Sequence, residues 1–118
     1  MTIDDFFDLH PEARPICDAV AAAVAGLPGV ETRVQKSQIG FHRSHPFAAV
    51  WIPERHLKRK GAPLVLSVFH RRRIASPRWK EVVEPARGRY THHLELFSPS
   101  GVDPEVEGWL VQAWEEAA

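Results

Sequence analysis

The chain has 118 residues, a length at which one domain forms a hydrophobic core without disulfides, and its 44% hydrophobic and 25% charged residues are typical of a globular protein. A single cysteine excludes an internal disulfide, the longest near-apolar run (19–30) is too short to span a membrane, and the acidic start predicts no secretory signal, so we expect a cytoplasmic protein. The net charge of zero conceals a segregation, because residues 33–93 carry 14 Lys and Arg against three Glu, a net +11, and the flanks carry −11.

Two helices are predicted before the first strand. Thr2 followed three residues later by Asp5 resembles a capping box, which predicts a short helix over residues 4–9. Pro11 suits the first position of a longer helix, and the Gly and Pro residues of 26–29 end it. The apolar residues that recur at helical spacing along this second helix are Ile16, Val20, Ala23, Val24 and Leu27.

From residue 30 the apolar pattern changes to a period of two, which predicts strands. The first two expected strands form a hairpin linked by Lys36 and Ser37, and the third is apolar on both faces, as in the centre of a sheet. Residues 54–61 are too polar for anything other than an exposed connection or a helical turn. The predicted strands are residues 30–35, 38–43, 47–52, 64–71 and 90–97.

Two further helices are expected in the last third of the chain. Ser76 and Pro77 predict the cap and first position of a short helix that ends near Glu84. Asp103 is predicted to cap a closing helix with Pro104 at its first position. The apolar face of that closing helix consists of Val106, Trp109, Leu110, Ala113 and Trp114.

This order predicts a single α+β domain, in which an antiparallel sheet of about five strands packs the N-terminal and C-terminal helices on one face. Whether the short helix around Trp79 covers the other face stays open. The charge segregation has two interpretations: an anion-binding surface, or acidic helices that neutralise a basic sheet internally, and we favour the second.

Several sequence blocks resemble an uncharacterised bacterial domain family of unknown function, and the resemblance spans nearly the whole chain. The most specific blocks are Lys-Ser-Gln-Ile-x-Phe and Arg-Trp-Lys-Glu. The element order is also similar to YdhG-like and frataxin-like arrangements, in which terminal helices cover one face of an antiparallel sheet; this second resemblance rests on topology alone. Neither resemblance implies catalytic residues. The blocks are residues 34–41, 47–51, 76–84 and 91–96.

The seven histidines do not predict a metal site. His92 and His93 are adjacent on a strand and point to opposite faces, while His42 and His45 lack a thiolate or a placed carboxylate. By analogy with frataxin, an acidic first helix would bind iron, but we interpret its carboxylates as a solvated face. These carboxylates are Asp4, Asp5, Asp8, Glu12 and Asp18.

No enzyme class is favoured by the sequence. Cys17 lies beside Ile16 on the apolar side of a helix, which indicates a packed thiol. Lys36 and Ser37 have no recognisable base beside them, and no phosphate loop or dinucleotide motif occurs, so no cofactor is predicted.

The remaining constellation is basic and aromatic, and it is the predicted ligand site. Its members are Lys36, Ser37, Gln38, Arg43, Arg78, Trp79, Lys80, His92 and His93. If they converge, Trp79 forms a wall and the cations receive an anionic small molecule or a single-stranded nucleic acid. The opposing interpretation is that Trp79 fills the core while the cations stay solvated.

We therefore predict a small non-enzymatic binding module with a basic, Trp-containing surface for an anionic ligand or partner. The first alternative is a metal-handling protein or small enzyme that uses histidines near the same groove. The second is a protein–protein interaction domain, in which acidic helices of one copy meet the basic side of another in a homodimer.

Overall fold

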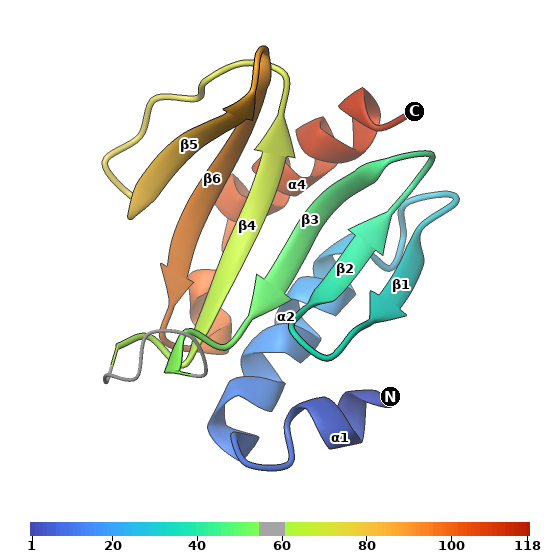
Figure 1. Ribbon diagram of the computed structural model, residues 1–118, viewed down its shortest axis with the longest axis vertical. Coiled ribbons are helices and arrows are strands. Elements are labelled where there is room, and N and C mark those ends of the chain that lie inside the picture. The colour runs from blue at the N-terminus through green and yellow to red at the C-terminus, as the bar shows by residue number, and fades with distance from the viewer. Residues whose placement is uncertain (55–60) are drawn as a thin grey trace.

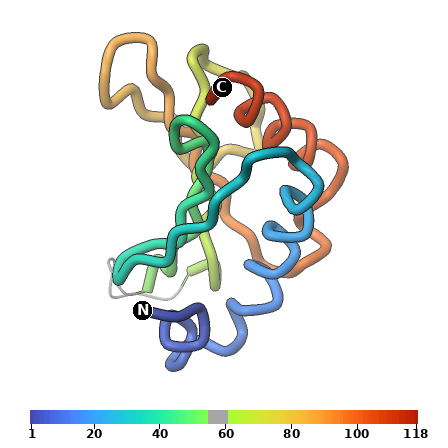
Figure 2. Tube along the Cα trace, turned by 90° about the vertical axis from the view of Figure 1, so that its right-hand side faces the viewer, coloured from blue at the N-terminus to red at the C-terminus, as the bar shows by residue number. Residues whose placement is uncertain are grey.

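The computed structural model describes residues 1–54 and 61–118. They form an antiparallel sheet of six strands, in the order β1-β2-β3-β4-β6-β5, with the long helices on one face (Figures 1 and 2). The α+β class and the placement of the terminal helices are as predicted. None of the described helices has the length and apolar character that a membrane crossing requires.

The elements follow one another in nearly the predicted order. The helices are α1 (Ile3–Phe6), α2 (Arg14–Val24) and α4 (Pro104–Glu116), with 3-10 turns at Pro11–Ala13 and Pro99–Gly101. The strands are β1 (Glu31–Val34), β2 (Ile39–His42), β3 (Pro46–Trp51), β4 (Leu64–His70), β5 (Glu81–Ala86) and β6 (Arg89–Leu96). The polar connection expected at 54–61 lies mostly outside the described residues, because only its two end residues are described.

Two of the three predicted helix caps, Thr2 and Asp103, are present, whereas the helix that Ser76 was predicted to cap does not form. The Thr2 hydroxyl accepts from the Asp5 backbone N–H while the Asp5 carboxylate accepts from the Thr2 N–H, each at 3.1 Å. The α1 helix nevertheless ends at Phe6, three residues before the predicted end. At the other end of the chain, the Asp103 carboxylate accepts from the Val106 backbone N–H at 3.1 Å. These bonds satisfy backbone donors that a helix start leaves open.

One hydrophobic core lies between the sheet and the helices. Along each central strand every second side chain enters this core, so the opposite face of the sheet carries the other half of the side chains. The apolar residues predicted for α2 and α4 supply the helix side. Fully buried members are Phe6, Ile16, Val20, Ile39, Phe41, Leu64, Leu66, Leu96 and Leu110.

The prediction of a short helix from Pro77 to Glu84 is wrong, because this segment forms no helix. The chain makes a turn at Pro77–Arg78 and then runs as edge strand β5, paired with β6, so the sheet has six strands where about five were expected. The β-branched pair Val82-Val83 fits a pleated strand better than a helix. Pro85 is tolerated because β5 lies at the edge, where a missing backbone donor costs no ladder bond.

Candidate functional site

The structure does not bring the predicted constellation together on one surface. Successive side chains of β6 alternate between the faces, so His92 enters the core below the helices and His93 lies on the open face, as their adjacency predicted. Trp79 is also on the helix side, in contact with His92. The predicted ligand residues therefore divide into two groups with the sheet between them.

Trp79 belongs to a buried aromatic stack and does not cover the open face. Its ring centroid lies 4.9 Å from that of His92 and 4.2 Å from that of Trp109, and the residue is 9% exposed. The Trp79 indole N–H donates to the Ile74 carbonyl at 3.0 Å. Of the two opposing interpretations of Trp79, core packing is the one that the geometry supports.

His92 is a core histidine whose two ring nitrogens are both in use. Its Nε2 accepts from the Ile74 backbone N–H at 2.9 Å, so the ring proton is on Nδ1, which donates to the Val68 carbonyl at 3.3 Å. Burial lowers the pKa of His92, which favours this neutral form. His92 and Trp79 thus both bond to the backbone of Ile74, which holds the connection between β4 and β5 against the core.

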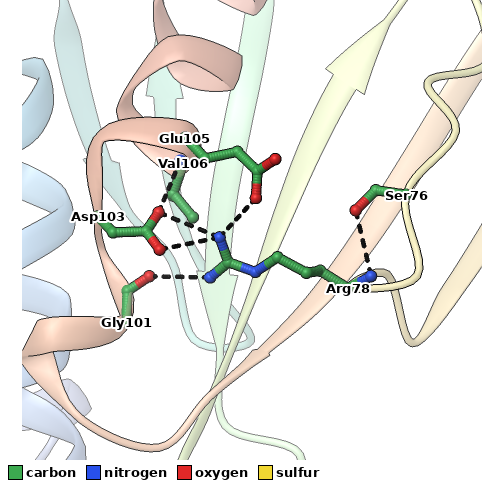
Figure 3. Close-up of polar contacts among 6 residues, drawn as sticks. All are labelled: Ser76, Arg78, Gly101, Asp103, Glu105 and Val106. Carbon is green, nitrogen blue, oxygen red and sulfur yellow. Dashed lines mark hydrogen bonds and ion pairs between the residues drawn. The ribbon is translucent and has the colours of Figure 1, made fainter.

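Arg78 is bound to the start of α4 (Figure 3). One terminal nitrogen, Nη1, lies 3.1 and 3.0 Å from the two carboxylate oxygens of Asp103 and 2.8 Å from Glu105, and Nη2 donates to the Gly101 carbonyl at 3.3 Å. The bonds to Glu105 and then Asp103 raise the pKa of Arg78. This guanidinium therefore neutralises the acidic first turn of α4 within the chain.

Two other predicted cations also have partners. Lys80 lies 3.3 Å from a carboxylate oxygen of Glu95, and Arg43 stacks on the Trp114 ring at 3.8 Å from its centroid. Lys36 is exposed in the link between β1 and β2, beside Ser37. The cations proposed as the centre of a ligand site are thus spread over three places.

Ser37, Gln38 and His93 do meet, at a hollow of about 430 Å³ on the open face of the sheet. The hollow exists because the central strands β3 and β4 present a pair of small side chains, Ala49 and Ser67, with His93 paired to Ser67 on the next strand. The cross-strand rows on either side contain larger groups. We call this site the open-face hollow; its lining residues are Ser37, Gln38, Ala49, Trp51, Ser67, Phe69, Thr91 and His93.

A hydrogen-bond chain lies along the floor of the open-face hollow. The Trp51 indole N–H donates to the Ser67 hydroxyl at 2.9 Å, and that hydroxyl lies 2.7 Å from Nδ1 of His93. Burial lowers the pKa of His93, so the ring is neutral at pH 7. Trp51 and Ser67 were not among the predicted site residues.

The end of β4 and the turn of the β5–β6 hairpin lie at the same end of the sheet (Figure 1), and the chain has five exposed arginines at or just beyond these points. We call this surface the arginine end; it consists of Arg71, Arg72, Arg73, Arg87 and Arg89. Residues 70 and 90 are paired, which places Arg71 beside Arg89 on the adjoining strand. Within residues 1–54 and 61–118, none of the five side chains forms an ion pair.

A second hollow, of about 300 Å³, opens at the arginine end. Arg71, Arg89 and Tyr90 contribute to its wall, and Phe69 and Thr91 line both this hollow and the open-face hollow. The two hollows are therefore adjacent along β4 and β6. The run Arg71-Arg72-Arg73 was visible in the sequence, but its convergence with Arg87 and Arg89 depends on strand pairing.

His70 lies behind this second hollow, with its side chain fully buried. Its Nδ1 is 3.2 Å from the Glu116 carboxylate, which also accepts from the Arg71 backbone N–H at 2.6 Å. Among the described residues, Nε2 of His70 is a buried polar atom without a hydrogen-bond partner. Burial is the main cause that lowers the pKa of His70.

The nucleophile and metal interpretations gain little from the geometry. Burial raises the pKa of the Cys17 thiol to about 12, which excludes a reactive thiolate at neutral pH. In the described part of the chain, His10, Glu12 and Glu54 bring possible ligand atoms within 4.8 Å of one another, a grouping that sequence spacing did not reveal. Both carboxylates are exposed, and within residues 1–54 and 61–118 no further ligand joins this group.

The acidic first helix, considered as a frataxin-like iron surface, has much of its charge engaged. The Arg14 guanidinium lies 2.7 Å from Asp4 and 3.3 Å from Asp18. Asp5 forms the capping box. This is consistent with our interpretation of an ordinary acidic face.

The chain belongs to a family described as a domain of unknown function (DUF5655), whose model matches residues 3–117. The expected resemblance to a family of unknown function is therefore confirmed over almost the whole chain. No curated protein and no solved structure matches the chain. The YdhG-like and frataxin-like element order accordingly stays a prediction.

Proposed function

We propose that this domain is a non-enzymatic binding module for single-stranded nucleic acid, whose phosphates contact the arginine end. The proposal keeps the predicted class of function and moves the site away from Lys36, Arg78 and Lys80. The observation that carries it is the gathering of five exposed arginines that form no ion pair with the described residues.

Arginine favours phosphate as the partner. The planar guanidinium presents donors in a fork that matches phosphate oxygens, and five such groups at one end of a sheet create a strong local positive potential. Asp103 and Glu105 bind Arg78, and Glu95 binds Lys80. Two acids lie at the arginine end, but they bond to other groups: Glu116 to His70 and the Arg71 backbone N–H, and Glu84 to the Gly88 backbone N–H. Arginines beside aromatic residues are also how proteins hold single-stranded nucleic acid.

The test is fluorescence anisotropy of a short mixed-sequence single-stranded oligonucleotide, titrated with protein at several salt concentrations. Five phosphate contacts predict that the logarithm of the binding constant falls with the logarithm of salt with a slope of about −3.5. The affinity should then fall about 100-fold between 50 and 200 mM salt. Binding that ignores salt, or none at 50 mM, would overturn the proposal.

Variants locate the surface. Arg71→Ser with Arg89→Ser should reduce the slope to about −2, so that the same rise in salt weakens binding only about 20-fold. The control is Arg33→Ser, which makes the same type of substitution but removes one positive charge from the far edge strand, where a 52% exposed side chain pairs with Glu31 at 2.9 Å. An equal effect of the control would contradict a localised site. Tighter binding of an acidic peptide than of the oligonucleotide would indicate an acidic protein partner in place of nucleic acid.

A further inference from the structure

We propose that the open-face hollow receives one base of the bound strand, so that the domain reads a nucleotide through its ring as well as its phosphate. This inference rests on the proposed function. It places the base in a hollow that none of the five arginines lines. Three observations support it: the shape of the hollow, its neutral polar lining and its position beside the arginine end.

The shape of the hollow suits a flat ring. Ala49 and Ser67 form a low floor in the middle of the sheet, next to Gly40 on β2. Aromatic side chains of the two neighbouring rows, Trp51 and Phe69, line its sides. Base–aromatic contacts of this kind are the usual means by which proteins hold unpaired bases.

The lining is polar but carries no full charge. The side chains that can form hydrogen bonds are the hydroxyls of Ser37 and Thr91, the amide of Gln38 and the neutral imidazole of His93. Neither a carboxylate nor a lysine or arginine is among the described lining residues. A neutral ring with donors and acceptors at its edge matches such a lining, whereas a phosphate does not.

The hollow and the arginine end are close enough for one nucleotide chain to occupy both. Phe69 and Thr91 line both hollows. Arg71, directly after the end of β4, follows Phe69 by two residues, and Arg89 precedes Thr91 by two residues on β6, a separation of about 7 Å in extended chain. A base in the open-face hollow therefore places the adjoining backbone phosphates at the arginines.

The decisive experiment compares two oligonucleotides with the same number of phosphates, one with normal bases and one in which every base is missing. We expect the abasic strand to bind at least about fivefold more weakly, the lower end of what one base–aromatic contact contributes. The salt slope should be the same for both, because the phosphates are unchanged. Equal affinities with the expected slope would refute the base site and leave the proposed function intact, whereas no binding of either strand would refute both.

Variants test whether the difference in affinity between the normal and the abasic strand arises at the open-face hollow. Phe69→Ala and, separately, Gln38→Ala at the rim should weaken binding of the normal strand with no change in salt slope and no change for the abasic strand. The control is Val83→Ala, an open-face position on the edge strand that does not line the hollow. If the control and the hollow variants weaken binding equally, the base does not occupy this site.

The base site can also be tested on the unmodified protein, so that the test does not depend on whether each variant folds. The Trp51 indole N–H has its own NMR resonance, and its hydrogen bond to Ser67 places it in the floor of the hollow. Titration with the normal oligonucleotide should shift this resonance, and titration with the abasic strand should not. A resonance that stays fixed while the normal strand saturates the protein would overturn the inference.

Discussion

Replacement of Trp79 separates a core role from a ligand role. Its ring lies between His92 and Trp109, at 4.9 and 4.2 Å between centroids, and its indole N–H donates to the Ile74 carbonyl. Trp79→Ala should therefore lower the free energy of unfolding by about 3–5 kcal/mol, as expected for loss of a buried aromatic group. Because that is a large part of the stability of a typical domain, Trp79→Phe, with an expected cost of about 1–2 kcal/mol, is the more informative change.

The assay is urea unfolding followed by far-UV circular dichroism, with oligonucleotide affinity measured where each variant is folded. The matched control is Trp114→Phe, which also removes an indole donor, bonded to the Pro28 carbonyl at 2.9 Å, but from a partly buried position at the edge of the core. The control should cost less than Trp79→Phe, and neither should change the affinity. If Trp79→Phe unfolds at the wild-type urea concentration but binds the strand more weakly, then Trp79 is a ligand residue and the core interpretation is refuted.

Three further outcomes follow from the contacts. Arg78→Gln should destabilise the domain by about 1 kcal/mol, since its partly exposed ion pairs are screened by water, and should leave the affinity unchanged in the anisotropy assay. Burial lowers the folded-state pKa of His70 and His92, so below pH 6.5 the unfolded chain binds more protons than the folded one. The free energy of unfolding should therefore be constant with respect to these two groups above pH 6.5 and should decrease as the pH falls below it. Each histidine contributes up to about 1.4 kcal/mol per pH unit, which urea unfolding at pH 5 to 8 would measure. Ser67→Ala should shift the Trp51 indole resonance and cost about 1 kcal/mol, and an unmoved resonance would contradict the hydrogen bond between them.

Local signals in the sequence predicted the helix caps at Thr2 and Asp103 correctly and missed the strand at 81–86. Thr2 and Asp103 act within three residues of themselves, so the caps could be predicted without knowledge of the fold. Pro77 gave a similar helix-start signal, but the choice of structure there depends on β6, far along the chain. The Lys80 N–H donates to the His93 carbonyl at 2.8 Å, and this pairing draws the segment into the sheet.

The site was predicted in part for the same reason. Alternation along β6 correctly placed His92 and His93 on opposite faces, because this depends only on adjacency. That Ser37 and Gln38 share a hollow with His93 depends on the order of four strands, β2, β3, β4 and β6, which the hydrophobic pattern does not specify. Trp51 and Ser67 were overlooked because they resemble ordinary strand residues until the cross-strand register is known.

The two interpretations of the charge segregation, internal neutralisation and an anion-binding surface, apply to different parts of the surface. Acids of the C-terminal segment neutralise Arg78 and Lys80, as internal compensation requires. At the arginine end none of the five guanidinium groups forms an ion pair with the described residues, and this is the surface proposed to bind anions. The salt slope measures which charges release counterions: about −3.5 corresponds to the arginine end alone, whereas all 14 cations of residues 33–93 would give about −10. Among the described residues, Arg33, Arg78 and Lys80 are paired with carboxylates and would leave a carboxylate exposed if they turned to phosphate, so we expect a slope nearer −3.5 than −10.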